Sequence, residues 1–391
     1  MRCGSKNLIS RMSSWRSTGG DEVAFDRLLN VAKKEFSDHI TSRRFVIILG
    51  LLLVISAVGA HAGIESYNNL LESYNQQLQH VQDIDVSGPY TGWMPEKPSI
   101  LLILSPMMSY MTTLGAVLAI AIGFDLVSKE KETRSLKSLL SHPVYRDEII
   151  NGKALGGIAA LGFAMVLALA ISLAILLLFS IVPTLTEFAA ILIFGAVTLG
   201  FLLAYFAIAL MMSTIAKESG NALIYTMVIF FAVSTLLPVL GAVAGEALAG
   251  DRPEPPRQTA PLPKEVIWVD NGGYSSTSVS QSVVYEGKAV EVDPAWQQYE
   301  DDMRAYSERR MLISSVTNLF SPQMNYFTAA MAVTNPRIAT VIHSPLDSMP
   351  AETPGLAEAL SQVWMNIAAL IVFPSAFFAA TYVKFMRMDI R

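Results

Sequence analysis

The sequence predicts an all-α polytopic membrane protein with six transmembrane helices, and three observations lead to this fold class. Hydrophobic residues make up 52% of the 391 residues and charged residues only 16%, well below the roughly 25% found in soluble proteins. Six apolar runs contain no Asp, Glu, Lys or Arg, and each is close to or above the about 20 helical residues that cross a bilayer core. Lys and Arg gather between alternate runs, as they do in cytoplasmic loops.

The chain begins with a polar tail and a predicted amphipathic helix, which together make up residues 1–44. Apolar side chains recur at three- and four-residue steps from Phe25 to Ile40, a pattern typical of a helix lying along the bilayer surface. The predicted spans follow at residues 45–63, 100–124, 154–182, 188–216, 222–245 and 363–383. Helices 1 to 5 therefore occupy residues 45–245, and residues 363–391 hold the sixth helix and a short tail.

Two longer segments are predicted to lie outside the cytoplasm. Residues 64–99 form the first, with a helix over Ser66–Asp83. Residues 246–362 form the second, where a Pro-rich linker, short strand patterns and an amphipathic helix over Trp296–Phe320 predict a small mixed α/β extracytoplasmic domain between helices 5 and 6. The apolar stretch Ser321–Asn335 is too short to cross a bilayer, so we expect a re-entrant or interfacial piece.

The distribution of charge predicts that both termini are cytoplasmic. The segments assigned to the inside are residues 1–44, 125–153, 217–221 and 384–391. They hold 19 of the 28 Lys and Arg residues, but only 12 of the 33 Asp and Glu residues. Because Lys and Arg in short loops stay in the cytoplasm, this excess sets the orientation of the chain.

The largest inner loop, Asp125–Lys153, has the most informative sequence. Glu130 and Arg134 stand at the favourable i, i+4 spacing of a helix, and Leu136, Leu139 and Leu140 fall on one apolar face. Pro143 then breaks the chain and can begin a second helix. Asp147 and Glu148 would lie in the first turn of that helix, where acidic groups suit the helix dipole.

The order of these features resembles the permease subunits of ABC-2 type transporters. In that family the loop after the second span commonly reads E-x-E-x-G-T-L-x-x-L-L-S-x-P-[VI]-x-R-x-E-[IL]-x-x-G-K, and this chain matches it except that Glu132-Thr133-Arg134 replaces Gly-Thr-Leu. The resemblance implies that the loop docks on a nucleotide-binding subunit. The residues expected to bind that partner are Glu130, Glu132, Thr133, Arg134, Leu136, Leu139, Leu140, Pro143, Arg146, Glu148 and Lys153.

The resemblance extends to the amphipathic helix, because family members carry an elbow helix ahead of the first span. Its membrane-facing residues here would be Phe25, Leu29, Phe36 and Ile40. It also implies a permease subunit in the plasma membrane that works as a homodimer, or with a similar partner chain, together with two ABC ATPase subunits. ATP and Mg²⁺ would bind to those partners, and transport would mostly be export. We expect the lipid bilayer, and no nucleic acid, among the other partners.

The sequence offers no catalytic or metal-binding motif of its own. Gly152-Lys153 lacks the upstream glycine and the following Ser or Thr of a phosphate-binding loop. Cys3 is the single cysteine and the five histidines are scattered, so no cysteine-based metal site is expected. We therefore expect a permease without enzymatic activity, whose energy comes from another chain or from an ion gradient.

Two other functions stay open. A secondary carrier is disfavoured, because ion-coupled carriers usually place ionisable residues inside the membrane and the predicted spans have none. A membrane anchor or receptor with an extracytoplasmic ligand-binding domain would also explain six spans and a large outer segment. Uncharged spans are compatible with lipids, hydrophobic compounds or polysaccharides as substrates, and with import or export.

Overall fold

The structure is a computed structural model that describes residues 26–83, 97–134, 145–256, 284–285, 288–289, 294–336 and 355–388. The chain divides into two compact units. The first comprises Met1–Val239 together with Thr317–Arg391, and the second is Leu240–Val316.

The prediction of six spans is confirmed. Six helices of the described residues are long and apolar enough to cross a membrane, and they cover Arg43–Gln79, Ile100–Glu132, Arg146–Leu178, Leu185–Ile215, Ser219–Leu248 and Trp364–Met386. Ahead of them, residues 26–41 form a helix that ends in a bend at Ser42. We call residues 26–41 the N-terminal helix.

The first span and the helix predicted over Ser66–Asp83 form one continuous helix. Helix α2 runs from Arg43 to Asp83 without a break, so the predicted outer helix is confirmed, whereas its continuity with the first span was not predicted. Residues 64–83 contain neither Pro nor Gly, so nothing in the backbone chemistry ends the helix. Gly63 lies where α2 crosses the start of the second span, and a Cβ atom there would come 1.9 Å from the carbonyl oxygen of Ile103.

The second span is assembled from short pieces. A 3-10 turn, η1 (Ile100–Ile103), leads into α3 (Leu104–Tyr110), the π-helical segment η2 (Met111–Gly115) and α4 (Ala116–Gly123). Ser99 caps the start, because its side chain accepts a hydrogen bond from the backbone N–H of Leu101 at 3.2 Å. After a turn, α5 covers Ser128–Glu132.

The third and fourth spans are regular helices. Helix α7 covers Arg146–Leu178 and α8 covers Leu185–Ile215. At the start of α8, Thr184 and Glu187 form a capping box in which the Thr184 N–H donates to the Glu187 carboxylate at 2.7 Å. This box satisfies N–H groups that the first helical turn leaves free.

The fifth span contains a second π-helical segment. It consists of α9 (Ser219–Phe231), η3 (Ala232–Leu236) and α10 (Leu237–Leu248). The π-helical segment η3 ends two residues before Pro238. Proline lacks an N–H and crowds the preceding turn, so the helix widens there. In the second unit, Gly245 of α10 packs on α11 (Pro294–Asn318), where a Cβ would lie 3.0 Å from the Arg310 carbonyl oxygen.

The described residues of the segment 246–362 are mostly helical, with irregular backbone over residues 249–256 and one pair of short strands. The strands β1 (Val284–Tyr285) and β2 (Lys288–Ala289) pair antiparallel. The predicted helix over Trp296–Phe320 is present as α11. The strand expected at residues 266–269 lies outside the described residues. Two-residue strands do not make a sheet that could carry a core, so the described residues do not support a mixed α/β domain.

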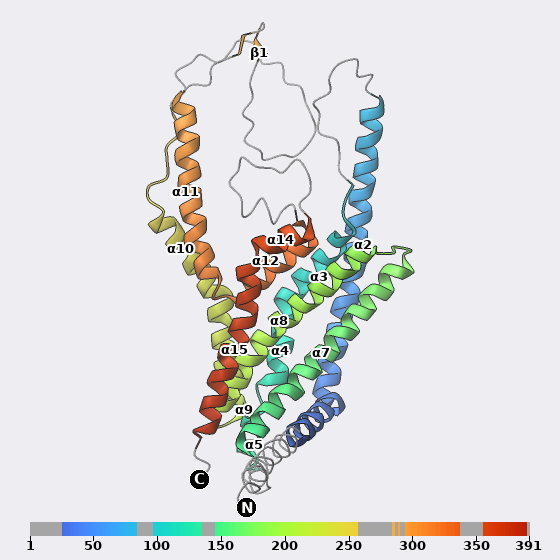
Figure 1. Ribbon diagram of the computed structural model, residues 1–391, viewed down its shortest axis with the longest axis vertical. Helices are drawn as coiled ribbons and strands as arrows, with labels where there is room; N and C mark the ends of the chain where they lie inside the picture. The colour runs from blue at the N-terminus through green and yellow to red at the C-terminus, as the bar shows by residue number, and fades with distance from the viewer. Residues whose placement is uncertain are drawn as a thin grey trace, which may run out of the picture. The chain divides into compact units, whose positions relative to one another are not determined.

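Helix α8 forms the centre of the first unit, between α4 and α15 (Trp364–Met386) in Figure 1. Its side chains Phe201 and Tyr205 are fully buried. Helix α12 (Pro322–Thr334) also packs on it, and Tyr326 of α12 stacks on Phe201 with ring centroids 4.5 Å apart. The apolar stretch that was expected to be re-entrant or interfacial therefore lies against a membrane-spanning helix. Helix α14 (Leu356–Gln362) comes directly before α15 in the chain.

Candidate functional site

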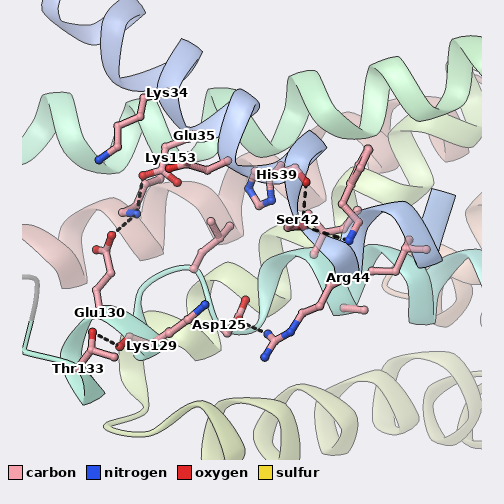
Figure 2. Close-up of a pocket in the computed structure, with 16 residues that line it drawn as sticks. Lys34, Glu35, His39, Ser42, Arg44, Asp125, Lys129, Glu130, Thr133 and Lys153 are labelled. Carbon is pink, nitrogen blue, oxygen red and sulfur yellow. Dashed lines mark hydrogen bonds and ion pairs between the residues drawn. The ribbon is translucent and has the colours of Figure 1, made fainter.

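One nearly fully buried lysine joins three segments at the charged end of the bundle. Lys153 lies in the third turn of α7 and is 2% exposed. Its Nζ is 2.8 Å from Glu35 Oε1 of the N-terminal helix and 2.7 Å from Glu130 Oε1 of α5, as Figure 2 shows. Lysine is almost never buried unless it is paired. We call Glu35, Glu130 and Lys153 the Lys153 cluster.

Two glycines of α7 bring the N-terminal helix close enough for this contact. A Cβ atom at Gly152 would lie 2.5 Å from Val31 Cγ1, and one at Gly156 would lie 2.6 Å from Glu35 Cβ. The backbones can approach this closely because both positions lack a side chain. The Glu35 carboxylate therefore reaches the Lys153 amine directly.

A second contact holds the N-terminal helix to the start of α7. Arg27 Nε donates to Glu148 Oε1 at 3.0 Å, and its guanidinium lies 5.3 Å from the centre of the Tyr145 ring. The other oxygen of Glu148 accepts the Tyr145 N–H at 3.0 Å and thereby caps α7. The N-terminal helix is thus attached to α7 at two places along its length.

The short helix α5 is tied to the turn between α8 and α9. The hydroxyl of Ser213 accepts the backbone N–H groups of Val127 at 2.9 Å and Ser128 at 3.0 Å, so it caps α5. Lys131 Nζ donates to the carbonyl oxygens that end α8, including that of Ala216 at 3.0 Å. Each side chain satisfies backbone groups at the end of another helix, and the dipole at the C-terminal end of α8 favours the positive charge of Lys131.

Glu132 caps the next helix in the same way. Its Oε2 accepts the Ser219 N–H at 3.3 Å and the Ser219 hydroxyl at 3.0 Å, at the start of α9. Together, Ser213, Lys131 and Glu132 fix α5 to both helices that meet at this turn. A displacement of α5 must therefore displace the adjoining ends of α8 and α9.

Two further contacts complete the charged end. Arg44, at the start of α2, forms an ion pair with Asp125, which follows α4. Arg146, at the start of α7, donates from Nη1 to the carbonyl oxygen of Met388, just after α15, at 2.9 Å. Every span therefore has an end that is tied to a neighbour through a charged side chain.

The predicted partner-binding residues fall into three groups. Glu130, Glu132, Arg146, Glu148 and Lys153 take part in the contacts above. Thr133 and Arg134 end α5: the Thr133 hydroxyl donates to the Lys129 carbonyl oxygen at 2.9 Å, and Arg134 has a φ of 56°. Leu136, Leu139, Leu140 and Pro143 lie outside the described residues.

The expected helical pairing of Glu130 with Arg134 was wrong. It required a helix through residue 134, but α5 ends at Glu132 and Arg134 adopts a left-handed conformation. The Glu130 carboxylate contacts Lys153 instead. A contact between residues 23 positions apart depends on how α5 and α7 cross, which i, i+4 spacing does not describe.

The described residues do not support the prediction that Phe25, Leu29, Phe36 and Ile40 face the membrane from an elbow helix. Phe36 and Ile40 pack against the core of the bundle, and Phe36 meets Phe163 edge-to-face at 6.2 Å. Leu29 is exposed, and Phe25 lies outside the described residues.

Sequence reasoning missed several residues of this site, among them Glu35, Lys131 and Ser213. The signal that could have found Glu35 is the pair of glycines at positions 152 and 156, which indicates a helix packed on that face of α7. The role of Ser213 leaves no signal, since a serine near a helix end is common.

A cavity of about 290 Å³ lies beside the Lys153 cluster. His39 of the N-terminal helix lines it, and its Nε2 is buried without a hydrogen-bond partner among the described residues. Burial lowers the pKa of His39 from its usual 6.5. Lys153 lowers that pKa further, whereas Glu35, Asp125 and Asp38 act to raise it. The imidazole is therefore neutral at pH 7. In the described part of the chain, no group of three or more His, Cys, Asp or Glu residues could hold a metal ion.

The comparisons with known proteins agree with this architecture. The family described as ABC-2 family transporter protein matches residues 29–390, which includes the N-terminal helix from Leu29 onward and all six spans. No curated protein matches the chain. Permeases of this family are membrane subunits, so membership implies that an ABC ATPase subunit partners the chain. With nearly its whole length covered by the family, the chain belongs to the ABC-2 family of transporter proteins.

Proposed function

We propose that this chain is the permease subunit of an ABC-2 exporter and that a separate ABC ATPase drives it. Its own residues bind no nucleotide in this proposal; ATP and Mg²⁺ occupy the partner. The observation that carries the proposal is the set of charged contacts around α5, which joins the loop between the second and third spans to the ends of other helices.

Different residues of the loop would bind the partner and transmit force to the helices. The charged residues of the loop that make internal contacts hold the helix ends together. The apolar residues Leu136, Leu139 and Leu140, with Pro143 at the corner, then serve as the partner's binding surface. Apolar anchors supply affinity at such interfaces, while rim charges mainly adjust association. A push on this loop reaches α7 through Lys153 and reaches α8 and α9 through Lys131 and Glu132.

The charge distribution supports the orientation of the subunit. The end of the bundle that carries the Lys153 cluster would face the cytoplasm of a cell whose plasma membrane holds the protein, with both termini on that side. The N-terminal helix would then lie at the inner surface as the elbow helix, with Phe36 and Ile40 facing the bundle.

A complete transporter would contain two copies of this chain and two ATPase subunits. Six spans form half of the usual pathway in the family. Several spans present wide apolar faces. Only 11% of the most apolar stretch of the fifth span is buried inside the protein, and the same share is buried in the sixth span. Lipid and a second copy of the chain would cover these faces.

The secondary-carrier alternative finds less support. Glu148 and Lys153 are the charged side chains that are almost fully buried in the described residues. Both lie in the first three turns of α7, at the charged end, rather than in the middle of a span. An ion-coupled carrier needs ionisable groups along the path inside the membrane.

The decisive experiment combines pull-down with ATP hydrolysis. A candidate ABC ATPase subunit is co-expressed with this chain, and the complex is reconstituted in liposomes. Leu139→Ala with Leu140→Ala should weaken ATPase binding by about 2 kcal/mol or more, as the loss of hot-spot anchors does. The matched control is Leu177→Ala with Leu178→Ala at the opposite end of α7, where both leucines are exposed.

Full ATPase binding and transport by the Leu139/Leu140 variant would refute the docking proposal. Equal loss in the control variant would show a general packing defect instead. Uptake that follows an ion gradient and needs no ATPase would favour the secondary carrier.

A further inference from the structure

The cavity beside the Lys153 cluster combines an apolar wall with a charged rim. Phe45, Ile48, Ala121, Ile122 and Leu126 line one part of it. These residues belong to the apolar beginning of the first span and the apolar end of the second. The volume of about 290 Å³ lies at the lower end of the range of ligand pockets.

The opposite part of the lining is polar and charged. Figure 2 shows the His39 ring and the Lys129 side chain between the Lys153–Glu130 pair and the Arg44–Asp125 pair. Within one cavity, the lining thus changes from apolar to charged along both α2 and the second span. This change marks the boundary between the hydrocarbon core and the headgroup layer. A ligand matched to both parts must itself be amphipathic.

The charges of the rim indicate which polar head group of an amphipathic ligand fits. Four cations and four anions line the cavity, and His39 is neutral, so the lining carries no net charge. The charged residues are Lys34, Arg44, Lys129 and Lys153, with Glu35, Asp38, Asp125 and Glu130. Lys34 and Lys129 form no ion pair in the described part of the chain, and both residues are exposed. A buried, unpartnered His39 Nε2 adds a further hydrogen-bonding group.

We infer that this cavity binds the head of a zwitterionic phospholipid that carries a phosphate and a primary ammonium group. The phosphate would bind at the rim, where the flexible Lys34 and Lys129 side chains, which Figure 2 shows on opposite sides of the Lys153–Glu130 pair, can turn toward it and donate charge-assisted hydrogen bonds. The ammonium group would donate to Asp38 at the rim. The first part of an acyl chain would follow the wall made by Phe45 and Ile122. This inference does not depend on the ATPase proposal, because it concerns binding alone.

The test uses the full chain in phosphatidylcholine vesicles that contain a photoactivatable phosphatidylethanolamine. Irradiation followed by peptide mass spectrometry should place the label in residues 26–48 or 121–133. Unlabelled phosphatidylethanolamine should compete with the probe. Phosphatidylglycerol and phosphatidylcholine should compete poorly, since the first lacks an ammonium group and the second lacks ammonium hydrogens.

Two variants remove the site in different ways. Lys34→Gln with Lys129→Gln removes both phosphate donors and should weaken binding about tenfold, as expected for lost hydrogen bonds to a charged group. Ala121→Phe fills the apolar wall without changing a charge and should abolish labelling. The control, Lys33→Gln with Lys217→Gln, removes two exposed lysines that do not line the cavity.

Several results would overturn the inference. Wild-type labelling in both the lysine and the Ala121→Phe variants would place the lipid elsewhere. Equal competition by phosphatidylglycerol and phosphatidylcholine would refute the ligand class. Equal competition by soluble glycerophosphoethanolamine would show that the apolar wall plays no part and that the ligand is a free headgroup.

Discussion

Replacing Lys153 with methionine should separate the stabilising role of the Lys153 cluster from its role in transmission. Methionine has a similar length and keeps the packing of the aliphatic stem, but it leaves two carboxylates facing each other without a cation. Breaking a buried ion pair by removing one partner costs about 3–5 kcal/mol. The side chains of Glu35 and Glu130 are 13% and 22% exposed, so water can reach them. We therefore expect the free energy of unfolding to fall by about 3 kcal/mol.

Neutralising the two partners at the same time should recover most of that loss. The triple variant Lys153→Met, Glu35→Gln, Glu130→Gln replaces the ion cluster with neutral groups of similar size, a change that is often close to neutral in stability. Lys33→Met is the matched control, because Lys33 is an exposed lysine on the N-terminal helix outside the cluster. Unfolding by denaturant in detergent gives the free energies.

The coupling assay decides what the cluster does. Transport and ATP hydrolysis are measured in liposomes with the partner ATPase. If the cluster transmits force, the triple variant should fold well yet hydrolyse ATP with little transport. A triple variant that regains full transport would show that the charges serve packing alone. A Lys153→Met variant as stable as the Lys33→Met control would refute the argument from burial.

Three other predictions follow from particular residues. Gly156→Ala should destabilise the protein by about 1–3 kcal/mol through overpacking against the N-terminal helix, whereas Gly162→Ala, which meets nothing within 4 Å, should be neutral or stabilising in the same denaturant titration. Cysteines introduced at Ser138 and Ser275 should react with an impermeant reagent from opposite sides of a sealed membrane; labelling of both from one side would refute the orientation. His39 should make the protein less stable as the pH falls below about 6.5. The folded state holds its pKa below the unfolded value, so the unfolded chain binds more protons; thermal unfolding of His39→Gln should lose this dependence, and an unchanged pH profile would contradict it.

The sequence alone determined the number and places of the spans. Each span is predicted by local properties, namely about 20 residues of apolar helix without charge, and the six helices of the structure confirm them. The loop pattern from Glu130 to Lys153 was enough to predict the family. The outer helix over Ser66–Asp83 was also predicted from local properties. Its continuity with the first span was not predicted, although neither Pro nor Gly stands between residues 64 and 83.

Only the tertiary structure decided what the charged residues contact. In the sequence, Glu130 and Lys153 stand in a solvent-exposed loop pattern, and Glu35 stands 118 positions before its partner Lys153. Their meeting depends on the close approach of the N-terminal helix at Gly152 and Gly156. Such pairs form between helices whose crossing angles are set by packing over their whole length. Charge type and spacing along one helix do not contain that information, so a predicted docking surface proved to include the contacts that hold the helix ends together.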